Sequence, residues 1–169
     1  MSNFRGVKPS IEKTRVLAAL RERLEHDLAV AAEAQRQTQS GATHEESKPE
    51  NDKDTRALES SYLARGQAQR VIELTQAVAS ASALVLRAFG PDSPIGATAL
   101  VALDDGSDIA HYFLSPVGGG LSFEVDGALV RVLTTASPLG RALVGQIEGA
   151  DIEVHTPQGM RQYSISTVS

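Results

Sequence analysis

Apolar residues recur at helical spacing in the first part of the chain. Four leucines stand three or four residues apart, with charged side chains between them: Leu17, Leu20, Leu24 and Leu28. This spacing places them on one face of an amphipathic helix. Ser10 is the natural N-cap, and the pattern fades in the polar run QRQTQSG. The sequence therefore predicts a helix over residues 10–37.

A second apolar pattern of helical spacing follows a polar interval. It begins between Asp52 and Thr55, where acidic residues favour the positive end of a helix. It continues to about Phe89, and the run GPDSP then ends it. The apolar positions are Leu58, Tyr62, Leu63, Val71, Leu74 and Val78. Because Ala, Ser and Gln fill much of this stretch, we expect a thin packing seam.

Each predicted helix has one apolar stripe and must bury it against a partner to be stable. The nearest partner is the other helix, so we expect an antiparallel coiled-coil hairpin over residues 10–90. A helix of residues 10–37 would be roughly 40 Å long. Residues 44–54, which we call the acidic tip, lie at the turn of this hairpin. They would stand at its far end.

The pattern changes to short runs after Pro94. Stretches rich in Val, Leu and aromatic residues alternate with turn sequences, and Asp126-Gly127 is a strong signal for a tight hairpin. Residues 137–145, SPLGRALVG, predict a short helix capped by Ser137 with Pro138 in its first position. Two further strands follow. Residues 95–169 therefore predict a small antiparallel sheet with one helix, which gives the chain an α+β fold.

Length and composition limit the possible classes of protein. The chain has 169 residues and no cysteine, which excludes disulfides, thiolate catalysis and cysteine-ligated zinc. It lacks an apolar run long enough for a membrane span, and MSNFRGVKPS lacks a secretory core. We expect a cytoplasmic protein with no membrane partner. Residues 1–9 are interpreted as a flexible lead.

Charge is distributed unevenly along the chain. Residues 45–54 carry five acids and two lysines, for a net charge of −3. The remainder of residues 1–91 has a net charge of +4, and residues 92–169 have a net charge of −6. A duplex-DNA-binding protein usually shows a larger basic surplus on one face. The sequence therefore disfavours direct binding to DNA and marks the acidic tip as the candidate site.

These motifs together resemble a known family. SPLGRALVG followed by the strand pair DIEVHTPQGMRQYSISTV resembles the C-terminal signature of the Gre family of bacterial transcription elongation factors. The resemblance implies an N-terminal coiled coil with an acidic tip and an FKBP-like C-terminal domain. This sequence has that order over nearly its whole length. Its lead KPSIEK departs from the Pro-apolar-Thr start that is usual in the family.

The resemblance also implies a function for the acidic tip. Gre proteins insert their coiled coil into the secondary channel of RNA polymerase, and tip carboxylates help to hold Mg²⁺ for cleavage of backtracked RNA. The family tip reads Asp-x-x-Glu-Asn, whereas here the nearest string is Glu46-Ser-Lys-Pro-Glu50-Asn51. Counting back from Arg70-Val71 aligns Glu50 with the tip aspartate and Lys53 with the tip glutamate. The candidate carboxylates are therefore Glu50, Asp54 and Glu46.

The remaining expectations concern partners. A Gre-like factor stimulates the polymerase's own cleavage activity and is not an enzyme by itself, and it meets the RNA and DNA of the elongation complex only indirectly. Three arginines of the second helix could face RNA or the channel wall: Arg56, Arg65 and Arg70. The Mg²⁺ would be shared with the polymerase. We expect a monomer.

Three alternatives stay open at this point. A Gre-like protein could occupy the secondary channel and inhibit transcription without stimulating cleavage, and the irregular tip with Pro49 is compatible with that. An FKBP-like fold could also be a peptidyl-prolyl isomerase, although the C-terminal half has few aromatic residues for a proline pocket. A plain coiled-coil adaptor would not bind polymerase at all.

Overall fold

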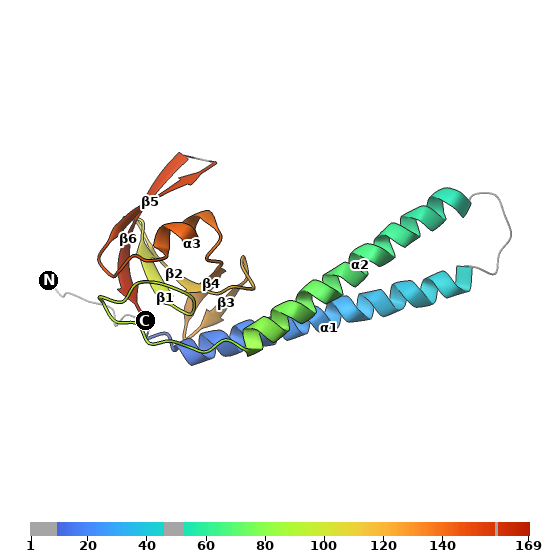
Figure 1. Ribbon diagram of the computed structural model, residues 1–169, viewed down its shortest axis with the longest axis horizontal. Helices are drawn as coiled ribbons and strands as arrows, with labels where there is room; N and C mark the ends of the chain where they lie inside the picture. The colour runs from blue at the N-terminus through green and yellow to red at the C-terminus, as the bar shows by residue number, and fades with distance from the viewer. Residues whose placement is uncertain (1–9, 46–52, 158) are drawn as a thin grey trace. The chain divides into compact units, whose positions relative to one another are not determined.

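The computed structural model describes residues 10–45, 53–157 and 159–169 of the chain. Two long helices precede six strands and a short helix, which confirms the predicted α+β class (Figure 1). The elements are α1 (Lys13–Glu45), α2 (Lys53–Ser82), β1 (Leu100–Asp104), β2 (Ile109–Leu114), β3 (Ser122–Val125), β4 (Ala128–Leu133), α3 (Pro138–Leu143), β5 (Asp151–Thr156) and β6 (Gly159–Val168).

The chain divides into two compact units, and the division falls inside α1. Arg21–Ser82 form the hairpin unit. Residues up to Leu20, together with Ala83–Ser169, form the sheet unit. The first two turns of α1 therefore belong with the sheet, although the sequence predicts that the whole first helix belongs to the hairpin.

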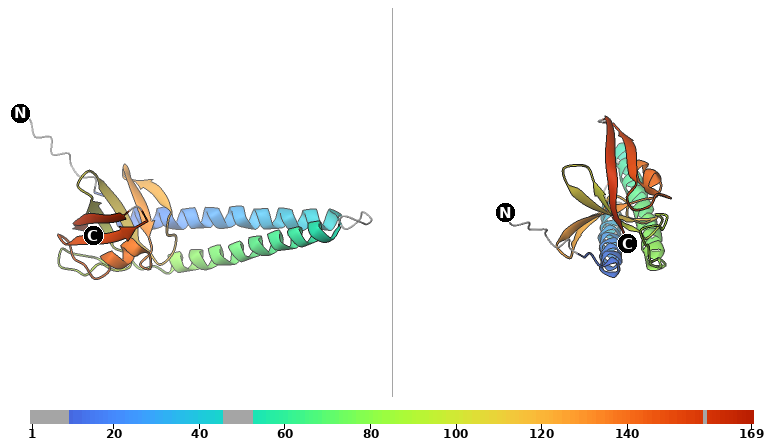
Figure 2. Two further views of the ribbon diagram at one scale, coloured as in Figure 1. Left: turned by 90° about the horizontal axis from the view of Figure 1, so that it is seen from above. Right: turned by 90° about the vertical axis from the view of Figure 1, so that its left-hand side faces the viewer.

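In the hairpin unit, α1 and α2 run antiparallel and side by side (Figures 1 and 2). Leu24, Leu74 and Ala81 are buried along the seam. Many of the half-buried positions beside them are alanines, such as Ala31 and Ala64. Alanine removes little apolar area from water, so the seam is as thin as the composition predicts.

The C-terminal ends of both long helices differ from the expected positions. Helix α1 continues to Glu45 instead of fading after residue 37, and α2 ends at Ser82 instead of near Phe89. The end of α2 is capped by a side chain of α1. Arg21 donates from Nε to the Ala81 carbonyl at 3.0 Å and from Nη2 to the Ser82 carbonyl at 3.1 Å. These are carbonyls that a helix C-terminus leaves without intrahelical partners.

Gly66 lies in the interior of α2, is exposed, and has no neighbouring atom within 4 Å of the position a Cβ would take. Gly66→Ala should therefore stabilise the hairpin unit by about 0.5–1 kcal/mol, because alanine loses less backbone entropy in a helix. Urea unfolding followed by circular dichroism at 222 nm would measure this. Ala79→Gly, the reverse change at an exposed site of the same helix, should destabilise the hairpin unit by a similar amount. If both variants shifted the free energy of unfolding in the same direction, the argument would be contradicted.

The sheet unit contains one six-stranded sheet with the order β3-β4-β2-β1-β6-β5. Strands β2 and β4 pair in parallel, and the other four pairs are antiparallel. The sheet is therefore mixed, not wholly antiparallel as expected. The difference arises because β3 lies at the edge of the sheet and β4 returns from it to pair with β2. Strand β4 therefore runs in the same direction as β2. Asp126 and Gly127 form the predicted tight turn of that hairpin, with positive φ at both positions.

One face of the sheet packs against α3. Strand register places Val101 beside Tyr112 and Leu103 beside Ala110, on the same face. Val101 and Leu103 belong to a buried cluster with Leu114, Ile165 and Leu143 of α3. This cluster is the core that the alternating strand pattern predicts.

The opposite face is buried as well. Leu100, Phe113 and Val132 are neighbours across three strands, and each is at most 5% exposed. The start of α1 supplies three further buried side chains: Val16, Leu17 and Leu20. A Cβ on Gly118 would lie 2.6 Å from Leu20 Cδ1 and 3.8 Å from Val132 Cγ1, so this glycine permits the close approach. The beginning of α1 therefore covers the second face.

Polar contacts attach the start of α1 to the sheet unit. The backbone N–H of Glu12 donates to Asp126 Oδ2 at 3.0 Å, and Arg15 forms an ion pair with the same carboxylate. Lys13 donates to the Arg87 carbonyl and lies over the Phe89 ring, 4.8 Å from its centroid. Burial lowers the pKa of the Lys13 ammonium. The first turn of α1 is thus attached to the β3–β4 turn and to the segment that follows α2.

Candidate functional site

Most of the acidic tip falls in the sequence between the two long helices. Helix α1 ends at Glu45 and α2 begins at Lys53. Glu46 and Glu50 lie outside the described residues. The backbone of Asp54 lies in the first turn of α2, where the helix dipole favours an acidic residue. Two helices of 33 and 30 residues therefore lead to and from the acidic tip.

The three candidate arginines of α2 do not form one patch. Arg56, Arg65 and Arg70 are all exposed. At 100° per residue, Arg56 and Arg70 lie about 40° apart around the helix, whereas Arg65 lies on the opposite side from Arg56. Arg70 Nη1 is 4.0 Å from Glu73 Oε2, the limit of an ion pair. A single partner surface therefore cannot contact all three along one side of α2.

Part of the predicted apolar stripe of α2 faces solvent. Leu58, Tyr62 and Leu63 are 58%, 63% and 57% exposed. Around α2, Leu58 lies about 160° and Tyr62 about 120° from Leu74, the buried seam residue. The prediction that these residues pack against the first helix is wrong. On α1, the residues nearest the acidic tip include Gln37, Thr38, Gln39 and Ser40, which offer no apolar surface.

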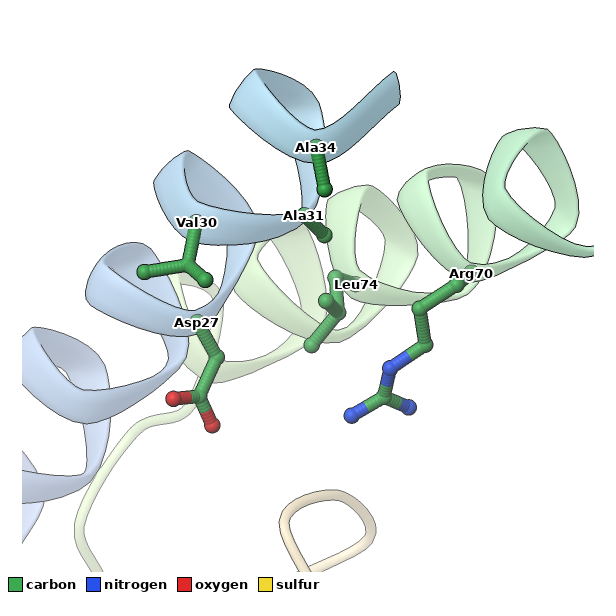
Figure 3. Close-up of a pocket in the computed structure, with 6 residues that line it drawn as sticks. All are labelled: Asp27, Val30, Ala31, Ala34, Arg70 and Leu74. Carbon is green, nitrogen blue, oxygen red and sulfur yellow. The ribbon is translucent and has the colours of Figure 1, made fainter. Parts of the chain in front are cut away.

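A shallow groove of about 310 Å³ lies along the hairpin unit, a feature that neither helix reveals alone (Figure 3). Its floor is apolar and its margins carry one acid and one base. Asp27 and Arg70 stand on opposite sides of Leu74 (Figure 3). The lining residues are Asp27, Val30, Ala31, Ala34, Arg70 and Leu74. Arg70 is the one predicted partner-binding residue that lines it.

The start of α3 is a capped helix terminus. Ser137 Oγ accepts a hydrogen bond from the Gly140 N–H at 3.0 Å, and Pro138 occupies the first helical position. The Ser137 hydroxyl in turn donates to the Thr134 carbonyl at 2.8 Å. These contacts confirm the interpretation of Ser137 and Pro138 as helix-start residues.

The aromatic residues of the sheet unit serve packing. Phe113 is fully buried, and Tyr112 and Tyr163 pack against the core cluster beneath α3. Burial raises the pKa of the Tyr112 hydroxyl, with a smaller opposing effect from Arg131. A proline-binding pocket needs aromatic rings that line a cavity. Because Phe113 is buried and the two tyrosine rings pack against the core cluster, the arrangement disfavours the peptidyl-prolyl isomerase alternative.

Across residues 10–45, 53–157 and 159–169, no three His, Asp or Glu side chains gather as a set of metal ligands. Over the same parts of the chain, no helix combines the length and the apolar character that crossing a membrane requires. Any metal site that uses Glu46 or Glu50 would include residues beyond those described.

Sequence comparison identifies relatives of the chain. Residues 121–169 match the family model described as transcription elongation factor GreA/GreB, C-terminal. Transcription elongation factor GreA of Rickettsia prowazekii is 33% identical over 100 residues, which are 59% of this chain and 58% of that protein. The GreA of Rickettsia typhi matches with the same identity and coverage. The chain thus matches less than two thirds of the length of these curated relatives.

Solved structures give weaker similarities. The Gfh1 (GreA factor homolog 1) protein of Thermus thermophilus is 20% identical, with a TM-score of 0.37 and coverage of 88% of this chain and 94% of that one. Thermus aquaticus Gfh1 is also 20% identical, with a TM-score of 0.39 and coverage of 87% and 92%. The sequence matches carry the assignment: the chain is a relative of the GreA/GreB transcription elongation factors, with a GreA/GreB-type C-terminal domain.

Proposed function

We propose that this protein is a transcription elongation factor of the cytoplasm that binds RNA polymerase through its secondary channel and stimulates cleavage of backtracked RNA. One observation carries the proposal. Five carboxylates are concentrated between Glu45 and Asp54, where α1 ends and α2 begins, in a chain whose C-terminal domain is of the GreA/GreB type. The GreA relatives are named transcription elongation factors.

The two long helices suit the delivery of carboxylates to a distant site. At about 1.5 Å per residue, the part of α1 that belongs to the hairpin unit, residues 21–45, spans roughly 37 Å, and the 30 residues of α2 span roughly 45 Å. A narrow hairpin of this length can enter a channel that a globular domain cannot. Acids at its turn would then reach a buried catalytic centre of the polymerase.

Mg²⁺ provides the chemical reason for acids at this place. It prefers hard oxygen ligands and usually keeps several waters, with one or two carboxylates and substrate phosphates completing its shell. We assign Glu50, Asp54 and Glu46 as the carboxylates that share this ion with the polymerase. Several close acids repel one another in the free protein, and a cation relieves that repulsion. The factor supplies ligands, and the polymerase carries out the hydrolysis.

Arg70 and Arg56 are the arginines best placed to act together in this function, because they lie within about 40° of each other around α2. On a hairpin inside a channel they would face the same wall or the same RNA segment. Arg65 faces the opposite side and would contact a different surface.

A second candidate function keeps the partner and reverses the effect. The acids Glu46 and Glu50 are separated by one residue more than in the Asp-x-x-Glu string of the family, and Pro49 stands between them. Proline restricts the backbone and the residue that precedes it. A tip of this form could occupy the channel without placing two carboxylates on one ion. The protein would then inhibit transcription by occupancy.

RNA cleavage in a stalled, backtracked elongation complex tests the proposal. The wild-type protein should shorten the RNA in a Mg²⁺-dependent reaction, and Glu50→Ala/Asp54→Ala should reduce the rate at least roughly tenfold, the scale expected when a ligand of a catalytic ion is lost. Glu22→Ala/Glu25→Ala is the matched control. It removes two exposed acids from α1 that are remote from the turn, and it should cleave like the wild type.

The outcomes separate the candidate functions. Inhibition that survives Glu50→Ala/Asp54→Ala, without cleavage by the wild type, would establish channel occupancy. A protein that neither cleaves nor competes with a known secondary-channel factor would contradict both polymerase functions.

A further inference from the structure

The seam between α1 and α2 changes its chemistry along the hairpin unit. In residues 21–31 and 71–82, which we call the inner half, the buried and half-buried side chains are mostly apolar. The larger ones are Leu24, Leu28, Val71, Leu74 and Val78. Arg21 of α1 also donates hydrogen bonds to the carbonyls of Ala81 and Ser82 of α2. Apolar burial and hydrogen bonds between the helices therefore hold the inner half together.

The outer half, residues 34–40 of α1 and 58–70 of α2, lacks these contacts. None of these residues is buried, and those that are half-buried carry short or polar side chains. They are Ala34, Gln35, Thr38, Ala64, Gln67 and Ala68. The large apolar side chains of this stretch, Leu58, Tyr62 and Leu63, are each more than half exposed. Because partly buried methyl groups remove little apolar area from water, the outer seam contributes little to holding the helices together.

The polar groups of the outer seam do not compensate for this. The side-chain oxygen of Gln67, Oε1, is buried and has no hydrogen-bond partner, and such a group loses its hydration without a return. Thr38 donates to the Ala34 carbonyl at 3.1 Å, and Ser40 donates to the Gln37 carbonyl at 2.9 Å. Both of these hydroxyls bond within α1, so they do not join the helices. Separation of the helices here would return the Gln67 oxygen to water.

The groove lies where the two halves meet. It is lined by Leu74, a buried residue of the inner half, and by Ala31 and Ala34 on the other helix (Figure 3). The alanines are too short to fill the space beside Leu74, so packing is already incomplete at this boundary. Beyond it, each helix must depend mainly on its own propensity, and short helices in water are marginally stable on that basis.

We propose that the outer half of the hairpin unit opens and closes as one local unit in the free protein, while the inner half stays closed. Proteins open locally in contiguous segments, and the segments that open most readily are those with few buried apolar contacts. In the open form, residues 34–40 separate from residues 58–70 and the Gln67 side chain is hydrated. A narrow channel would admit only the closed form and would suppress the opening. That last consequence rests on the proposed function, whereas the opening itself does not.

Hydrogen–deuterium exchange of the full-length protein, followed by mass spectrometry, tests the opening. Amides of the outer half should exchange at least roughly a hundredfold faster than amides of the inner half. Gln67→Leu removes the unpartnered oxygen and adds an apolar side chain to the seam. It should slow exchange at least roughly fivefold in residues 58–70 and also in residues 34–40, which belong to the other helix. The effect crosses the seam because the two segments open together.

Gln69→Leu is the matched control. It makes the same chemical change two residues away, at an exposed position about 160° around α2, and it removes only a hydrogen bond to Glu73 of the same helix. Exchange in residues 34–40 should stay at the wild-type rate. Equal protection of the two halves in the wild type would overturn the proposal. Slower exchange confined to α2 in Gln67→Leu would also overturn it, because the helices would then fray independently. The free protein is used throughout, so neither result depends on whether RNA polymerase is bound.

Discussion

Gly140→Ala should unfold the sheet unit far below the temperature at which the wild type unfolds. A Cβ at this position would lie 2.0 Å from the Thr134 carbonyl oxygen and 3.0 Å from the Thr134 carbonyl carbon, both backbone atoms. The carbonyl oxygen cannot move freely, because it accepts hydrogen bonds from the Ser137 N–H at 3.1 Å and from the Ser137 hydroxyl at 2.8 Å. Relief of the overlap would break the cap of α3.

The expected loss is about 3 kcal/mol or more, the upper part of the range for overpacking in a rigid site. For a domain of this size that corresponds to a fall in Tm of roughly 10–20 °C. Displacement of α3 would also disturb Leu143, which is fully buried in the core. Thermal unfolding followed by near-ultraviolet circular dichroism of the sheet-unit tyrosines would measure the change.

Gly96→Ala is the matched control for this experiment. Its Cβ would meet only Arg87 Nη1, at 3.7 Å, the end of a flexible side chain. The variant should unfold within a few degrees of the wild type. Equal effects of Gly96→Ala and Gly140→Ala would show that the close approach to Thr134 is not the cause.

Elements set by local chemistry could be predicted from the sequence. The Asp126-Gly127 turn and the Ser137-Pro138 helix start depend on residues within three positions of each other, and the structure has both. The end of α2 could not be predicted in this way. Alanine, leucine and valine continue the helical pattern past Ser82, whereas the last carbonyls of the helix are capped by Arg21, which is about sixty residues away in the sequence.

The sequence indicates which residues of the long helices form an apolar face, but it does not indicate what that face packs against. The leucine pattern of the first helix indicates a buried stripe, but spacing does not show that Leu17 and Leu20 join the sheet unit while Leu24 joins the hairpin unit. Likewise, Leu58 and Tyr62 complete a helical pattern, yet they face solvent.

The candidate functional features also differ in whether the sequence alone reveals them. The acidic tip is visible in the sequence because its residues are consecutive, although Glu46 and Glu50 lie outside the described residues. The groove is not visible in the sequence, because Asp27 and Ala34 come from α1 and Arg70 and Leu74 from α2. Small residues spaced three apart, Ala31 and Ala34, were the available signal. They are equally typical of a tight helix seam.

The largest effect is expected when the sheet is separated from the start of α1. A fragment of residues 83–169 contains all six strands and α3, but it lacks Val16, Leu17 and Leu20. Burial of each such side chain contributes about 1.5–3 kcal/mol, so their loss removes about 5–9 kcal/mol. A small domain has only about 5–15 kcal/mol in total. We therefore expect the fragment to lack a cooperative unfolding transition and to aggregate through its uncovered face.

Restoration of the missing turns should restore the fold. Arg21 hydrogen-bonds the carbonyls of Ala81 and Ser82, so the two chain segments meet there and a short Gly/Ser linker can join residues 10–24 to 79–169. This shortened protein should unfold cooperatively and give a dispersed amide spectrum. The same protein with Leu20→Asp should behave like the bare fragment, because a carboxylate would be buried beside Gly118. Cooperative unfolding of residues 83–169 alone would show instead that the sheet does not need α1, and that the first helix begins as part of the hairpin.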